Sequence, residues 1–128
     1  MPQAAADKIR VLVVDDHEDN AFVVGKIFEL AGFEVRIASS GEIAIGSCFN
    51  FRPQAVLLDL NIPGVDVFEV CRRLRKMPAG EAILILILSG YLQDEHREKA
   101  LGAGATYCFM KPTAAGELLI AIRRHFAA

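Results

Sequence analysis

The sequence lacks an excess of positive charge. Its 14 lysine and arginine residues are outnumbered by 16 aspartate and glutamate residues, which gives a formal net charge of −2. A domain that binds nucleic acid through its phosphates normally carries a basic patch. The richest basic stretch, residues 72–76, is more simply the solvent side of a helix. We therefore expect no nucleic-acid partner.

Long hydrophobic runs are also missing. No early apolar segment resembles a signal peptide. The longest apolar run, residues 82–88, is far too short to span a bilayer. These two absences predict a cytoplasmic protein without membrane insertion.

Cysteine and histidine are scarce. The three cysteines, Cys48, Cys71 and Cys108, are widely spaced, and the three histidines do not cluster with them. This spacing argues against a disulfide framework and against a zinc site. We expect each cysteine to be a small buried hydrophobic residue in a reducing compartment.

The sequence does contain enough apolar residues for one core. Of its 128 residues, 53% are hydrophobic and 23% are charged, as in a single globular domain. We assign residues 1–8 to a flexible N-terminal tail and residues 9–126 to the domain. No internal repeat or low-complexity segment interrupts it, and we expect no output domain after the last helix.

Predicted strands and helices alternate strictly along the chain. Short apolar runs bounded by turn residues predict strands at 9–14, 34–38, 55–59, 83–89 and 107–110. Helices are predicted at 20–31, from 39–42 to about 50, from about 67 to Pro78, at 94–101 and from Thr113 to 126. This alternation predicts an α/β fold in which helices cover both faces of a parallel sheet.

Local patterns refine these helices. Val23, Ile27 and Leu30 recur at helical spacing and mark an apolar face of the first helix. The Ser39-x-x-Glu42 segment has the form of a capping box at the start of the second helix. The helix at 94–101 is highly charged and has few apolar anchors. Other predicted core-facing residues are Val67, Val70, Cys71, Leu74, Leu118, Leu119, Ile122 and Phe126.

Polar residues follow the ends of four predicted strands. Asp15 and Asp16 follow the first strand, Asp59 ends the third, Ser89 the fourth, and Lys111 follows the fifth. In an open parallel sheet, the carboxyl ends of the strands meet at the edge where ligands bind. A single aspartate there could merely cap a turn. The whole set predicts a functional site.

The charges of this set indicate its chemistry. Three crowded carboxylates repel one another unless cations compensate them. Lys111 supplies one positive charge, and Mg²⁺, which prefers carboxylate, carbonyl and water oxygens, would supply the rest. Asp59 would then attack a phosphoryl group and hold it as an acyl phosphate, with Lys111 and Ser89 against the phosphoryl oxygens. The expected metal ligands are Asp15 acting through water, Asp16, Asp59 and the backbone carbonyl of Asn61.

These motifs resemble those of receiver domains in two-component signalling, the response-regulator family. The resemblance rests on Val-Val-Asp15-Asp16, Leu-Leu-Asp59-Leu-Asn-Ile-Pro-Gly, Leu-Ser89-Gly-Tyr and Met-Lys111-Pro112. It covers almost the whole chain, and some details are similar to receivers of hybrid sensor kinases or of single-domain regulators. It implies a flavodoxin-like, doubly wound three-layer sandwich with strand order 2-1-3-4-5.

The resemblance also implies an activity. Asp59 would accept phosphate from a phosphohistidine on a histidine kinase or a histidine phosphotransfer domain. The protein would catalyse its own phosphorylation and slow dephosphorylation, without turning over an external substrate. Phosphorylation would switch the surface of the helix at 94–101, the strand at 107–110 and the last helix, toward an unknown downstream protein or a homodimer. A cis Lys111–Pro112 peptide bond is implied as well.

The sequence departs from the family at Cys108, where an aromatic residue is usual. Tyr107 is adjacent, but strand alternation directs it to the other side of the sheet. We therefore expect Cys108 to pack, and the signal to run through the loop around Ser89. Val67 replaces a common glycine. His17 is interpreted as a surface turn residue, and Asn61 and Tyr91 as side chains that tune hydrolysis of the acyl phosphate.

Three other functions remain as alternatives. A receiver-like docking module that works without phosphorylation is compatible with Cys108. A Mg²⁺-dependent phosphohydrolase would need a second carboxylate two residues after Asp59, where Asn61 stands. A flavin carrier of the same topology would need a phosphate-binding loop where Asp15 and Asp16 stand.

Overall fold

The computed structural model describes residues 8–62, 64–90, 94–111 and 115–127. These residues form a five-stranded parallel sheet of order β2-β1-β3-β4-β5, which confirms the predicted topology. The strands are β1 (Arg10–Val14), β2 (Glu34–Ala38), β3 (Ala55–Asp59), β4 (Leu84–Ser89) and β5 (Tyr107–Met110). The helices are α2 (Glu18–Leu30), α3 (Gly41–Phe51), α4 (Val67–Lys76), the short 3₁₀-helix η1 (Gly80–Ala82), α5 (Asp94–Ala103) and α6 (Ala115–Phe126).

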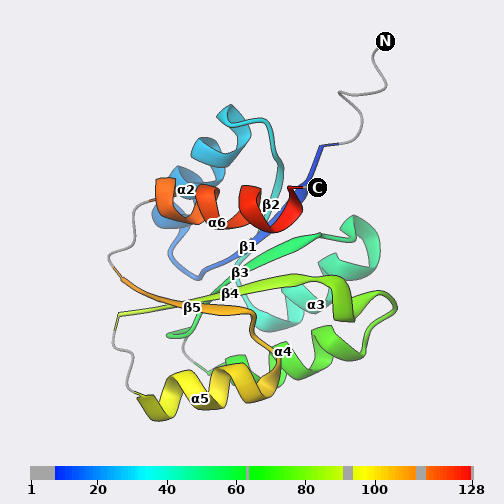
Figure 1. Ribbon diagram of the computed structural model, residues 1–128, viewed down its shortest axis with the longest axis vertical. Coiled ribbons are helices and arrows are strands. Elements are labelled where there is room, and N and C mark those ends of the chain that lie inside the picture. The colour runs from blue at the N-terminus through cyan, green and yellow to red at the C-terminus, as the bar shows by residue number, and fades with distance from the viewer. Residues whose placement is uncertain (1–7, 63, 91–93, 112–114, 128) are drawn as a thin grey trace.

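Helices cover both faces of the sheet. Figure 1 shows α2 and α6 on one side and α3, α4 and α5 on the other. Alternate residues of each central strand enter one of two cores, so Leu57 packs toward α6 while Val56 and Leu58 pack toward α4. All five residues of β3 are buried, which explains why the four residues before Asp59 are apolar on both faces of the sheet.

The buried face of α2 differs from the predicted one. Its exposed apolar residues are Phe22, Val23, Ile27 and Leu30, and its buried residues are Ala21, Gly25 and Phe28. The helix approaches β2 closely at Gly25, where an added Cβ would lie 3.5 Å from side-chain atoms of Val35 and Ile37. The buried face of α2 therefore combines the small residues Ala21 and Gly25 with Phe28, and the apolar side chains at the predicted spacing face solvent.

The start of α3 is also displaced from the prediction. Ser40, rather than Ser39, is the N-cap, and its Oγ accepts a hydrogen bond from the backbone N–H of Ile43 at 3.1 Å. The capping-box assignment is wrong because Glu42 then lies within the first turn instead of three residues after the cap. At α4, Asp66 caps in the same manner, accepting hydrogen bonds from Phe68 and Glu69.

The other predicted helices and strands are present where the structure describes the chain, with ends that differ by up to two residues. The expected apolar faces of α4 and α6 are buried or partly buried, and α5 buries only Ala100 and Ala103. The 3₁₀-helix η1 was not anticipated. No helix in the described ranges is long and apolar enough to cross a bilayer. The tail at residues 1–7, Tyr91, Pro112 of the implied cis bond and the Thr113 cap lie outside the described residues.

Candidate functional site

The sheet brings the predicted site residues to one edge. Asp59 is the last residue of β3, and Ser89 is the last residue of the neighbouring strand β4. Backbone hydrogen bonds continue past the strand ends, from Leu60 N–H to Leu88 O at 2.8 Å and from Lys111 N–H to Ser89 O at 2.6 Å. These bonds hold the residues that follow each strand in register, so loops far apart in sequence meet at a fixed place.

Asp59 is held at both of its carboxylate oxygens. Its side chain is 3% exposed, and Oδ2 lies 3.1 Å from Lys111 Nζ. Oδ1 accepts a hydrogen bond of 3.0 Å from the backbone N–H of Asn61. A carboxylate oriented by two donors, one of them charged, is positioned for an attack at a defined point in space.

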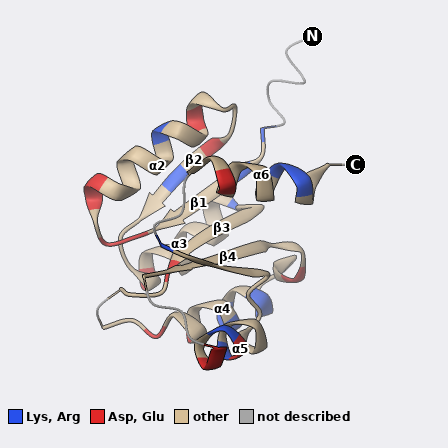
Figure 2. Cartoon of the chain, turned by 60° about the vertical axis from the view of Figure 1, so that its left-hand side comes forward, with Lys and Arg blue, Asp and Glu red and all other residues tan. Residues whose placement is uncertain are grey.

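Asp15 and Asp16 form the second part of the site. Asp15 Oδ1 accepts a hydrogen bond of 2.9 Å from the backbone N–H of His17. His17 Nδ1 lies 3.5 Å from Asp15 Oδ1 and 3.2 Å from Asp16 Oδ1. Figure 2 shows the acidic residues where β1 passes into α2. His17 is exposed, as expected for a turn residue, but its contact with both carboxylates was not predicted from the sequence.

This cluster has the composition of a site for a hard cation. One ligand atom each from Asp15, Asp16, His17 and Asp59 lies within 4.8 Å of the others. Asp16 Oδ1 is buried and receives no hydrogen bond from any residue that the structure describes, although His17 Nδ1 is near. A buried oxygen without a donor is costly unless something else satisfies it. Carboxylate oxygens are the ligands Mg²⁺ prefers, so this chain fits a divalent cation.

Ser89 and Asn61 flank Asp59 on neighbouring segments. Ser89 is fully buried, and at the next residue, Gly90, an added Cβ would meet only Asn61 Nδ2, at 3.9 Å, among the residues that the structure describes. Asn61 is exposed and borders a cavity of about 250 Å³ between the loop after β3 and His96 of α5. This cavity lies beside Asn61, two residues after Asp59, and Asp59 itself does not line it.

Cys108 packs as predicted. It is partly buried against the core beneath α4 and α5, while Tyr107 is 49% exposed on the other side of the strand. Burial raises the pKa of the Cys108 thiol, which the nearby Arg97 guanidinium only partly offsets. The thiol thus stays neutral near pH 7 and behaves as a small apolar side chain. Val67, which stands where the family commonly has glycine, is buried in the first turn of α4.

A family model provides the first comparison with known proteins. The model of the response regulator receiver domain matches residues 11–123. The match contains the strands and helices that carry all of the residues described above.

Curated proteins and solved structures agree with this match. The chain is 36% identical over 115 residues to response regulator MprA of Mycobacterium sp. (strain KMS), covering 90% of this chain and 49% of that protein. It is 31% identical over 111 residues to the sensor protein EvgS of Escherichia coli O157:H7, covering 87% of this chain and 9% of that protein. The chain thus spans half or less of the length of these curated relatives.

Among solved structures, the chemotaxis protein CheY4 of Vibrio cholerae superimposes with a TM-score of 0.87 at 27% identity, covering 93% of this chain and 99% of that one. A response regulator from Chloroflexus aurantiacus superimposes with a TM-score of 0.85 at 30% identity, covering 95% and 100%. The shared architecture extends over the whole sheet and its helices.

Proposed function

Because this chain belongs to the response-regulator receiver domains of two-component signalling, we propose that it accepts a phosphoryl group on Asp59 from a phosphohistidine. The observation that supports this most directly is the buried Asp59 carboxylate between the Lys111 ammonium and the Asn61 N–H. Two further carboxylates, Asp15 and Asp16, lie beside it.

The proposed reaction is a transfer between two nucleophiles. A carboxylate oxygen of Asp59 forms a bond to phosphorus while the bond from phosphorus to the donor's imidazole nitrogen breaks. The electron pair of that bond stays on the imidazole, which takes a proton from solvent. Phosphoryl transfer depends mainly on positioning and on charge stabilisation. Lys111 would stabilise the phosphoryl oxygens, which its ion pair with Asp59 supports, and the Ser89 hydroxyl would hold another of them.

Mg²⁺ is the proposed cofactor, and Asp15, Asp16, Asp59 and the Asn61 carbonyl are its proposed ligands. When bound, the ion would neutralise negative charge between the carboxylates and the incoming phosphoryl group. The unsatisfied Asp16 Oδ1 and the oxygen-rich composition of the cluster support this assignment. Asp15 is oriented for it by its hydrogen bond from His17.

The test is a measurement of intact mass. The protein is incubated with Mg²⁺ and a small acyl phosphate or phosphoramidate donor. We expect the mass of one phosphoryl group to be added, and the adduct to disappear in Asp59→Asn and in the presence of a chelator. Glu34→Gln is a control of equal charge change, because Glu34 is the exposed first residue of β2, at the opposite end of the parallel sheet from Asp59. No adduct with any donor would instead favour the docking module that works without phosphorylation.

We also propose a docking surface for the phosphodonor domain on α2. Phe22, Val23, Ile27 and Leu30 are exposed apolar side chains on this helix, and Leu30 is 87% exposed. The same helix begins directly after the acidic cluster. A histidine kinase or a phosphotransfer domain bound there would have its phosphohistidine near Asp59. Phe22→Ser should slow transfer from such a domain while leaving phosphorylation by a small donor unchanged.

The proposed output surface comprises α5, β5 and α6. It exposes Leu101, Tyr107, Met110 and Ile120. Helix α5 is anchored by two buried alanines, and segments with few buried contacts open most easily. A phosphoryl mimic should therefore change hydrogen exchange in residues 94–110, and unchanged exchange there would contradict the proposal. A downstream protein or a second copy of the chain would bind this surface.

A further inference from the structure

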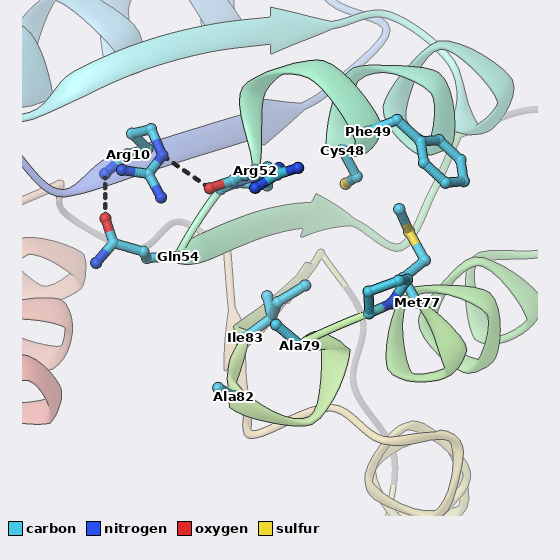
Figure 3. A pocket seen from close by; sticks show the side chains of 11 residues that line it. Arg10, Cys48, Phe49, Arg52, Gln54, Met77, Ala79, Ala82 and Ile83 are labelled. Carbon is cyan, nitrogen blue, oxygen red and sulfur yellow. Dashed lines mark hydrogen bonds between the residues drawn. The ribbon is translucent and has the colours of Figure 1, made fainter.

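A cavity of about 380 Å³ lies at the amino ends of the parallel strands, opposite the carboxyl ends where Asp59 stands. It is bordered by the start of β1, the last turn of α3, the α3–β3 loop, and the segment from the end of α4 through η1 to Ile83. Figure 3 shows these side chains around one hollow. Its volume lies in the range of pockets that bind small molecules. None of the residues in the proposed phosphoryl site lines it.

The lining combines an apolar body with two positive charges. Phe49, Met77 and Ile83 contribute apolar surface, and Arg10 and Arg52 contribute guanidinium groups, whereas no carboxylate of the described part of the chain lines the cavity. Phe49 is 62% exposed, which is unusual for phenylalanine and leaves its ring available to a ligand. Such a lining complements a molecule with one anionic end and one apolar end.

The two arginines differ in what they bind. Arg10 Nε donates a hydrogen bond of 2.8 Å to Arg52 O, and the backbone N–H of Arg10 donates one of 3.1 Å to Gln54 Oε1 (Figure 3). The Arg52 guanidinium makes no hydrogen bond or ion pair with any residue in the described ranges. Its donors, and the terminal nitrogens of Arg10, are therefore available for a carboxylate.

Backbone strain is concentrated at the same cavity. Among the described residues, the non-glycine residues with positive φ are Arg52 (φ 52°) and Ala79 (φ 62°), and both line the cavity. Arg52 ends α3 in the left-handed conformation that glycine adopts at lower energy. Residues held in such conformations cluster at ligand sites. A turn that served only to end α3 would be better made by glycine.

From these observations we infer that this cavity binds a small monocarboxylate with a short apolar body, its carboxylate held by Arg52 and Arg10 and its apolar part held against Phe49, Met77 and Ile83. Cys48 also lines the cavity, and burial raises the pKa of its thiol to about 11. The thiol is therefore neutral at pH 7 and adds apolar surface instead of a second nucleophile. This inference is independent of phosphorylation at Asp59.

Octanoate is the probe for the test, and 1-octanol is its uncharged counterpart. Backbone amide NMR shifts are followed during titration of each into the whole chain. We expect saturable shifts with octanoate in residues 48–54 and 77–83, and at least tenfold weaker binding of 1-octanol. Equal affinity for the two molecules, shifts elsewhere on the protein, or no saturation would overturn the inference.

Variants separate binding from folding. Arg52→Gly should weaken octanoate binding at least tenfold and yet raise the melting temperature, because glycine relieves the strained φ. Phe49→Ser should weaken binding without loss of folding, since its side chain is mostly exposed. Arg124→Gln, an equal charge change on the exposed side of α6, should leave binding unchanged. Full octanoate affinity in a stabilised Arg52→Gly protein would refute the role of the guanidinium.

Discussion

Lys111 Nζ lies 3.1 Å from Asp59 Oδ2 and joins a partly exposed ammonium to a buried carboxylate. The pair links the residue after β5 to the end of β3, across the intervening strand β4. The positive charge of Lys111 therefore compensates the buried Asp59 carboxylate and lowers the cost of burying it.

Replacing Lys111 by methionine should destabilise the metal-free protein. The substitution leaves the Asp59 charge buried without its cation, which should lower the free energy of unfolding by about 1–3 kcal/mol. This expected loss of stability is smaller than for a fully buried ion pair, because the Lys111 side chain is partly exposed to solvent. Urea denaturation in the presence of a chelator measures the effect.

The matched control is the double variant Asp59→Asn with Lys111→Met. It removes both charges, so most of the lost stability should return, and the cycle of four proteins isolates the coupling between the two residues. A single Lys111→Met variant as stable as the wild-type protein would show that the ion pair does not support the fold.

Mg²⁺ should stabilise the folded protein. A ligand that binds only the folded state at ten times its dissociation constant adds about 1.4 kcal/mol to the free energy of unfolding. Asp16→Asn should remove most of this gain, and the same variant should be more stable than the wild-type protein without metal, because one of three crowded carboxylates is neutralised. Thermal melts with chelator and with Mg²⁺ measure both effects. Asp19→Asn, an exposed residue in the first turn of α2, is the control of equal charge change.

Stability should fall at alkaline pH because of the buried thiols. Burial raises the pKa of Cys48 from its ordinary value of 9.0 to about 11 and that of Cys71 to about 12. In the unfolded chain these thiols ionise near pH 9, so between pH 9 and these raised values the unfolded state holds fewer protons than the folded state. The stability present below pH 9 is therefore lost as the pH rises, by up to about 1.4 kcal/mol per pH unit for each thiol.

Cys71→Ala tests this argument. The variant should be less stable than the wild-type protein at pH 7, but its stability should fall less steeply above pH 9. Val70→Ala deletes apolar volume from the neighbouring buried position on α4 and should leave the alkaline slope unchanged. Parallel slopes for Cys71→Ala and the wild-type protein would rule out the thiol as the cause.

Arg75 should be the most important arginine for stability. Its guanidinium donates hydrogen bonds to the carbonyl oxygens of Gly80, Gly104 and Ile83 and to Thr106 Oγ1. It thereby connects the end of α4, the segment before β4 and the turn before β5. Lysine cannot reach several acceptors in one plane, so Arg75→Lys should cost about 2–4 kcal/mol of unfolding free energy.

Arg72→Lys is the control for Arg75→Lys. Arg72 lies on the exposed side of the same helix and pairs with Glu69 three residues before it. Exposed pairs of this kind contribute at most about 1 kcal/mol. Equal losses for the two variants in urea denaturation would contradict the special role of Arg75.

The strand positions and the strand order were predictable because the central strands are buried on both faces. A short apolar run between turn residues most readily forms a buried strand. For this reason β3 and β5 begin and end where the sequence indicates. The grouping of Asp15, Asp59 and Lys111 followed from the parallel direction of the strands and required no distance information.

Other structural features depend on tertiary contacts that cannot be predicted from the periodicity of the sequence. The apolar spacing of α2 indicated a buried face that is in fact exposed, because close approach at Gly25 decides how this helix is seated. The bonds of Arg75 join segments 5 to 31 residues apart in sequence, and no local pattern identifies their acceptors. The position of His17 against Asp15 and Asp16 likewise depends on the path of one turn.

The packing of α6 has a consequence for the order of folding. Leu118 and Ile122 complete the core on the face of the sheet that α2 only partly covers, and Arg123 donates a hydrogen bond to Ala31 O at the end of α2. Until this late helix leaves the ribosome, one face of β1, β3 and β4 remains exposed to water. A nascent chain that stalls before Ala115 would therefore expose aggregation-prone apolar strands. We expect the protein to depend most on chaperones at this stage of synthesis.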